Sequence, residues 1–177
     1  MMFVSIGIGT VVAIALITVV SLLTGGKVND NATVQNALVG KSVRAFSLSG
    51  LNGGTVRSPW SSGHPGVLIF FASWCGPCKA EMPKIAKYLA THGEGSIQVL
   101  GIDTGDQRGA GQAFVRRAGA TFRVGFDPSS SIASGTFGFQ GIPETVFLNA
   151  KGTVVEVYPG AIPKDQLVKG LEVLRAA

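Results

Sequence analysis

The feature that most constrains the fold is a pair of cysteines placed between a strand pattern and a helix pattern. The uninterrupted apolar run over residues 67–72 is typical of a central strand that is buried on both faces. The motif Trp-Cys-Gly-Pro-Cys follows at 74–78, and apolar residues at helical spacing then predict a helix over 79–89. Cys75 is therefore expected at a helix N-terminus, where unpaired backbone N–H groups and the helix dipole favour a thiolate.

The spacing of the two cysteines predicts dithiol–disulfide exchange. A thiolate at Cys75 can attack a disulfide as the nucleophile, and Cys78 can then release the mixed disulfide as the resolving thiol. These are the only cysteines in the chain, and the histidines His64 and His92 lie far apart in sequence, so the four ligands of a zinc site are lacking. A purely structural disulfide between them would close a small loop and stabilise the fold little. We therefore expect a redox-active pair, with no metal, haem or nucleotide cofactor.

The N-terminal segment, residues 1–26, contains no charged side chain. Its apolar stretch over 3–23 rises about 1.5 Å per residue as a helix, which is enough to cross a hydrocarbon core of about 30 Å. We therefore predict an uncleaved transmembrane anchor (a signal-anchor) over 1–26, with a cleaved signal peptide as the alternative. The polar segment 27–39 is expected to be a linker, followed by a single domain over 40–177.

The formal net charge of +5 and the isoelectric point near 9.5 suggest two kinds of partner. The positive side chains are scattered and form no aromatic-basic stripe, so no nucleic-acid partner is expected. A basic surface close to anionic lipid headgroups is the simpler interpretation. The positive-inside rule does not define the orientation of the apolar segment, because no lysine or arginine precedes it and Lys27 follows it. We place the domain outside the cytoplasm because disulfide substrates persist there.

The remaining pattern alternates strands with helices. The turn residues and apolar periods predict a β-hairpin over 40–60, strands at 96–102 and 122–126, short helices at 112–117 and 130–137, a second hairpin over 144–158 and a last helix opening at Pro163. This order predicts an α/β fold with a mixed sheet.

Together with this pattern, the Trp-Cys-Gly-Pro-Cys motif, Pro83 and the dipeptide Ile142-Pro143 before a strand resemble the thioredoxin fold. Over residues 40–177 the chain resembles the membrane-anchored TlpA/ResA-like thiol-disulfide oxidoreductases. The resemblance implies a thioredoxin-like fold with a mixed central sheet, an N-terminal β-hairpin and a central αβ insertion between residues 102 and 126. It also implies a cis Ile142–Pro143 bond that faces the dithiol and presents backbone groups to an extended substrate.

A glutamate in the helix is the second catalytic candidate. Thioredoxins place a buried aspartate six residues before the nucleophile, where this chain has Ile69. The resemblance implies that Glu81 takes its place, and the i, i+3 spacing puts Glu81 on the helix face of Cys78. A partly buried carboxylate there would have a raised pKa and could accept the proton of the resolving thiol. A solvated glutamate beside Lys84 is the alternative.

Other residues are candidates for binding the substrate. Gly76 and Pro77 are expected to tune the geometry of the helix terminus, and Trp74 to pack beside the site and shape partner docking. Glu144 is a candidate for substrate discrimination, with an exposed loop glutamate as the alternative. The stretch Gly-Ile-Pro-Glu-Thr at 141–145 resembles that of the cytochrome c maturation members of the family.

The expected function is reduction of protein disulfides by a single-pass enzyme of the bacterial cell membrane. The resemblance implies apocytochrome c as the client and a membrane-embedded dithiol protein as the electron donor. A DsbA-like oxidant would use the same residues in the opposite direction, and only the reduction potential separates the two. Non-enzymatic alternatives are a module that holds unfolded cytochrome and a copper carrier, which would want a downstream histidine that residues 120–177 lack.

Overall fold

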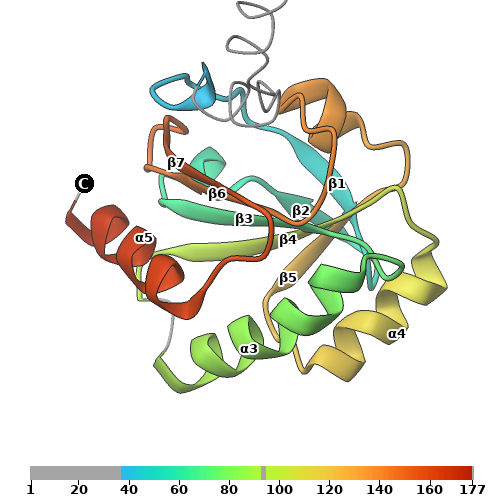
Figure 1. Cartoon of the computed structure of the whole chain (residues 1–177). Coiled ribbons are helices and arrows are strands. Elements are labelled where there is room, and N and C mark those ends of the chain that lie inside the picture. Colours follow the sequence, from blue (N-terminus) through green and yellow to red (C-terminus); the bar gives the residue numbers. More distant parts are fainter. Residues whose placement is uncertain (1–36, 93–94, 177) are drawn as a thin grey trace, which may run out of the picture. The chain divides into compact units, whose positions relative to one another are not determined.

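The computed structural model describes residues 37–92 and 95–176 (Figure 1). The predicted anchor over 1–26 and the linker up to residue 36 lie outside the described residues. Among the residues that are described, no helix combines the length and the apolarity that a membrane crossing requires.

One mixed seven-stranded sheet, in the order β2-β1-β5-β4-β3-β6-β7, organises the fold. Its strands are β1 (Ser47–Gly50), β2 (Thr55–Arg57), β3 (Gly66–Phe71), β4 (Gln98–Thr104), β5 (Arg123–Asp127), β6 (Glu144–Leu148) and β7 (Val154–Pro159). The central strand β3 runs parallel to β4 and antiparallel to β6, and all of its residues are buried. This burial explains why its sequence is apolar without alternation.

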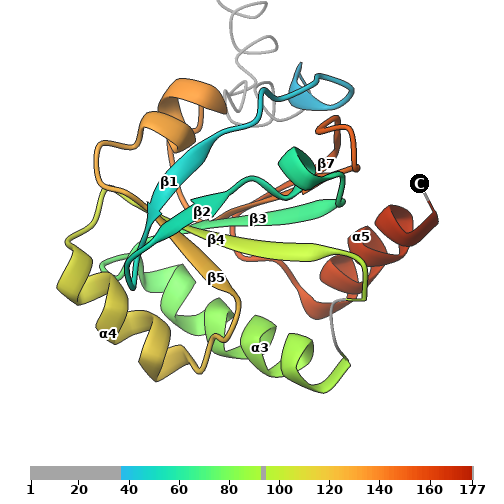
Figure 2. The same cartoon turned by 180° about the vertical axis from the view of Figure 1, so that it is seen from behind.

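Three helices cover one face of the sheet: α3 (Gly76–His92), α4 (Arg108–Ala118) and α5 (Lys164–Ala176) (Figure 1). A 3₁₀ turn at Pro59–Ser62 and a π-helical turn at Ser131–Thr136 contribute to the cover of the opposite face (Figure 2). Each face therefore has its own apolar cluster. The β1–β2 hairpin and the α4–β5 unit are the predicted N-terminal hairpin and central insertion, so the expected architecture is confirmed.

The cluster on the π-helical face centres on three phenylalanine rings. Phe70 meets both Phe137 and Phe139 edge to face, with ring centroids 5.2 Å apart in each pair. Burying each such ring contributes about 1.5–3 kcal/mol. This packing holds the π-helical turn against the end of β3, directly beside the cysteine motif.

The predicted helix at 112–117 begins earlier than expected, at Arg108. Gly109 lowers the helix propensity of the first turn and so obscured its start. Tertiary contacts compensate, because the Arg108 guanidinium donates to the carbonyls of Gly50 and Leu51 at 2.7 and 2.9 Å. The α-helix therefore extends to the edge of the active-site region.

Two other elements also differ from the prediction. The strand expected at 96–102 runs on through Asp103 and Thr104, two polar residues that the sheet buries. The helix expected at 130–137 is π-helical, and Asp127 accepts hydrogen bonds from the N–H groups of Ile132 and Ala133 at its start, each at 3.1 Å. In both cases polar side chains act inside the fold, which an apolar pattern does not reveal.

Candidate active site

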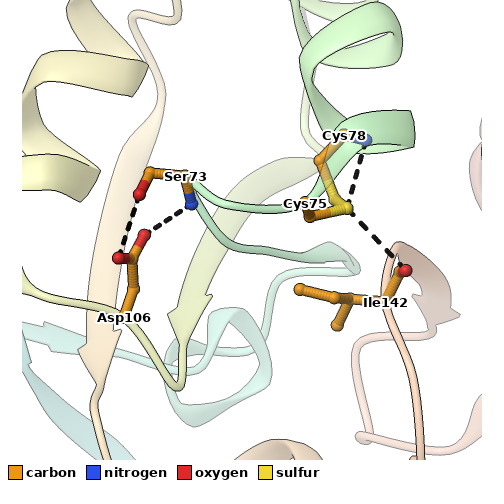
Figure 3. The surroundings of a disulfide bond; sticks show 5 residues. All are labelled: Ser73, Cys75, Cys78, Asp106 and Ile142. Atoms are coloured by element: carbon orange, nitrogen blue, oxygen red, sulfur yellow. Dashed lines mark hydrogen bonds between the residues drawn. A yellow bond between two sulfur atoms is a disulfide. The ribbon is translucent and has the colours of Figure 1, made fainter.

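The cysteine motif forms a disulfide at the N-terminus of α3 (Figure 3). Cys75 lies just before the helix, and Cys78 lies in its first turn. Cys75 and Cys78 are both almost fully buried. The backbone N–H of Cys78 points to Cys75 Sγ at 3.2 Å. Because such unpaired N–H groups stabilise negative charge, the helix start is suited to hold a thiolate on Cys75 after reduction.

The chain around Pro143 lies against this sulfur. The Ile142–Pro143 bond is cis, as expected. The carbonyl oxygen of Ile142 lies 3.8 Å from Cys75 Sγ (Figure 3), and Ile142 itself is half-buried. Backbone groups at this position can pair with an extended polypeptide that brings its disulfide to Cys75.

Trp74 is the exposed part of the motif. Its side chain is 62% exposed, and its indole N–H donates to the carbonyl of Gly105 at 3.0 Å. The ring borders a cleft of about 160 Å³ that Gly141 and Ile142 also line. A large exposed aromatic beside a reactive sulfur is typical of a protein-docking surface. Gly76 and Pro77 are exposed on the same loop, so a partner can contact the residues on both sides of Cys75.

Glu81 is buried on the same face of α3 as Cys78, and its side chain is only 5% exposed. Neither carboxylate oxygen makes a well-formed hydrogen bond within the described residues. Burial raises the pKa of Glu81 to about 7, and the backbone of Ile162 acts in the opposite direction with a smaller effect. Glu81 is one of the residues that line a groove of about 670 Å³ between α3 and the start of α5. The alternative of a solvated surface glutamate is therefore wrong.

Glu144 is also buried, with only 3% of its side chain exposed. It is the first residue of β6 and pairs with Phe70 on one side and Pro159 on the other. The alternative of an exposed loop glutamate is wrong for this residue as well.

Sequence reasoning missed a carboxylate that holds the active-site loop. Asp106 accepts hydrogen bonds from the backbone N–H and the hydroxyl of Ser73, two residues before the nucleophile (Figure 3). Gln107 donates a third bond through its N–H at 2.7 Å. Burial alone would raise the pKa of Asp106, but the bonds from Ser73 and Gln107 hold it below its usual value. The available signal was its position just beyond a parallel strand, at the sheet edge where functional loops gather.

Comparison with known proteins decides the family. The sequence model described as the AhpC/TSA family matches residues 39–157. The chain belongs to this family.

Curated relatives agree with the geometry of the site. The chain is 27% identical to thiol:disulfide interchange protein HelX of Rhodobacter capsulatus, over 84% of this chain and 83% of that protein. It is 23% identical to thiol-disulfide oxidoreductase ResA of Halalkalibacterium halodurans, over 92% and 93% of the two chains. These relatives and the disulfide motif together identify the chain as a thiol-disulfide oxidoreductase.

A solved structure gives the same result. A secreted Mycobacterium tuberculosis disulfide oxidoreductase homologous to E. coli DsbE superposes with a TM-score of 0.63 at 28% identity. The match covers 73% of this chain and 96% of that one. The thioredoxin-like fold expected from the sequence is therefore confirmed.

Proposed function

We propose that this chain reduces disulfides in exported proteins, with Cys75 as the nucleophile and Cys78 as the resolving thiol. The observation that carries the assignment is the Cys78 N–H aimed at Cys75 Sγ beside the Ile142 carbonyl. That N–H stabilises charge on one sulfur of the pair, and the exposed Trp74 and the Ile142 backbone lie where a substrate would approach it.

The first step is attack on the substrate. The Cys75 thiolate attacks one sulfur of the substrate disulfide, that S–S bond breaks, and the released substrate thiolate takes up a proton. A mixed disulfide now joins Cys75 to the substrate. The backbone of Ile142 holds the extended substrate in place while Trp74 covers the neighbouring residues.

The second step releases the reduced substrate. Cys78 gives its proton to the Glu81 carboxylate and attacks Cys75 Sγ, which forms the Cys75–Cys78 disulfide and frees the second substrate thiolate. That thiolate takes a proton, so the substrate has gained two electrons and two protons. A carboxyl with a pKa of about 7 is suited to this transfer at neutral pH, because it is substantially ionised yet basic enough to accept a proton.

Apocytochrome c is the proposed client, and a membrane-embedded dithiol protein is the proposed source of electrons. The resemblance of residues 141–145 to cytochrome c maturation proteins supports this client. An uncharged apolar segment over 1–26 supports a membrane anchor, with the catalytic domain outside the cytoplasm of a bacterial cell. Tethering would keep the enzyme close to a donor in the same membrane.

Mixed-disulfide trapping tests the assignment of the two sulfurs. The full-length chain carrying Cys78→Ser should accumulate a covalent complex with a disulfide-containing peptide, because no resolving thiol remains. The matched variant Cys75→Ser should trap none. Equal trapping by both variants, or trapping by Cys75→Ser alone, would overturn the assignment.

A redox titration tests the direction of the reaction. Potentials run from about −270 mV for thioredoxin to about −120 mV for DsbA. A potential of the full-length chain near the thioredoxin value is expected for a reductase. A potential near that of DsbA would instead make this chain an oxidant that introduces disulfides.

A further inference from the structure

Beneath the active-site loop lies a second carboxyl group, Asp103, for which the mechanism has no use. It lies near the end of β4 and pairs with Phe71 of β3 and Phe126 of β5. The residue is fully buried, at 0% exposure. Helix α4 covers it closely, because a Cβ atom added to Gly111 would collide with the Asp103 carboxylate. A carboxyl enclosed in this way is costly to ionise.

The hydrogen-bonding environment of Asp103 supplies acceptors rather than donors. No N–H or O–H group in the described part of the chain donates to either of its oxygens. The Asp106 carboxyl is close enough to raise the pKa of Asp103, and it already accepts bonds from Ser73 and Gln107. Two carboxyl groups can form a hydrogen bond with each other only when one of them carries a proton.

The nearest cation does not replace that proton. Arg108 acts on Asp103 from α4, but its guanidinium donates to the carbonyls of Gly50 and Leu51 and lies 4.3 Å from the centre of the Phe126 ring. The neighbours in β3 and β5 are apolar rings. Within residues 37–92 and 95–176, Asp106 and Arg108 are the charged groups that act on Asp103.

We propose that Asp103 is a positioning residue, which donates a proton to Asp106 and thereby holds the loop that carries Trp74 and Cys75. The link runs from Asp103 to Asp106 and from Asp106 to Ser73. Figure 3 shows the second part, between Asp106 and Ser73. A second link joins the same two loops, because the Trp74 indole donates to Gly105, next to Asp106. The significance of this loop for catalysis rests on the proposed role of Cys75.

The arrangement makes the loop sensitive to alkaline pH. Burial, and then the charge of Asp106, raise the pKa of Asp103 to about 8, while Arg108 opposes the rise. Below that pH the pair holds one proton and one negative charge. Above it, Asp103 releases the proton to solvent and both groups are negative. Their repulsion then displaces Asp106 and weakens its bonds to Ser73.

Tryptophan fluorescence of the oxidised full-length chain tests this proposal, because disulfide-bonded cysteines do not titrate. We expect a transition near pH 8 that disappears in Trp74→Phe. It should be about nine-tenths complete one pH unit above its midpoint, as for a single proton. In Asp103→Asn the amide can donate to Asp106 at every pH, so the transition should be absent.

A neighbouring buried aspartate provides the matched control. Asp127 is 1% exposed and accepts bonds from Thr104 and Ser131 side chains and from two backbone N–H groups, so its carboxylate has donors of its own. Asp127→Asn should keep the transition at its original pH even if the fold is less stable. Glu81→Gln should also keep it, which separates this proton from that of Glu81.

A kinetic readout connects the proton to the reaction. The alkylation rate of reduced Cys75 should rise with thiolate formation and then fall above pH 8 in the unsubstituted chain. In Asp103→Asn the rate should reach a plateau without the fall. A purely structural role of Asp103 would instead change the rate by the same factor at every pH.

Two outcomes would overturn the proposal. One is a fluorescence transition that persists unchanged in Asp103→Asn. The other needs no variant. Carboxyl-carbon NMR of the oxidised, unsubstituted chain would overturn the proposal if every aspartate titrated below pH 6. Failure of the trapping experiment would remove Cys75 as the nucleophile but would leave the fluorescence transition in place, so the two failures are distinguishable.

Discussion

Replacing Glu81 by glutamine should change how the stability of the fold depends on pH. The folded-state pKa of Glu81 is about 7, against an ordinary value of 4.5, because the carboxyl is buried. The folded state therefore binds a proton more tightly than the unfolded chain does. It follows that the contribution of Glu81 to stability is highest below pH 4.5 and is lost as the pH rises through 7. Glutamine has no proton to lose, so Glu81→Gln removes this decrease.

The magnitude follows from the two pKa values. They differ by about 2.5, and a difference of one in pKa corresponds to about 1.36 kcal/mol, so ionised Glu81 costs the fold at most about 3.4 kcal/mol. Glu81 borders the groove between α3 and α5, so a small shift of the charged carboxylate toward the groove would bring it into contact with water and reduce this cost. Relative to the unsubstituted chain, Glu81→Gln should therefore gain about 1–3 kcal/mol between pH 4 and pH 8.

Urea unfolding of the full-length chain in detergent, with the disulfide intact, measures this gain. Midpoints at pH 4, 6 and 8 should diverge between the unsubstituted chain and Glu81→Gln as the pH rises. Glu172→Gln, on the exposed side of α5, removes one negative charge from the surface and serves as the control. Parallel pH dependences for all three proteins would refute the conclusion that Glu81 is buried with a raised pKa.

Three further predictions concern catalysis, packing and topology. Glu81→Gln should slow the release of the mixed disulfide at neutral pH by about a hundredfold, the lower end for a general base, and stopped-flow measurement with a peptide disulfide checks this. Gly111→Ala should destabilise the fold by about 1–3 kcal/mol because its Cβ would meet Asp103. Gly109→Ala, in open space on the same helix, should instead stabilise it by about 0.5–1 kcal/mol, and thermal unfolding compares the two. A reporter that is active only after export should work when fused at residue 177; activity of a cytoplasm-only reporter there would contradict the proposed topology.

The parts of the fold that local sequence dictates were predictable. A continuous apolar run, a turn with two cysteines and a helical period each need only neighbouring residues to be interpreted, so β3, the motif and α3 followed from the sequence. The burial of Glu81 was one of two alternatives that helical spacing left open. Only the contact of α3 with residues near Ile162 decides between them.

The contribution of Asp103 and Asp106 was not predictable from local pattern. Asp106 and Ser73 lie 33 positions apart in sequence, and the parallel pairing of β3 with β4 brings their loops together. The register that places Asp103 beside Phe71 depends on the same pairing. The apolar pattern ended the strand at residue 102, and it did not show that Asp103 continues the strand or which loop Asp106 holds.

The edges of the sheet have a consequence for an enzyme whose proposed clients are unfolded. Unpaired edge strands recruit extended chains and can nucleate aggregation. Here one edge, β2, is only three residues long and carries Arg57, while the other, β7, carries Glu156 and ends at Pro159. Short length, charge and proline all discourage a passing polypeptide from adding as an extra strand. Under the proposed function, edges that resist strand addition favour docking of extended clients at the Ile142 backbone over docking at the rims of the sheet.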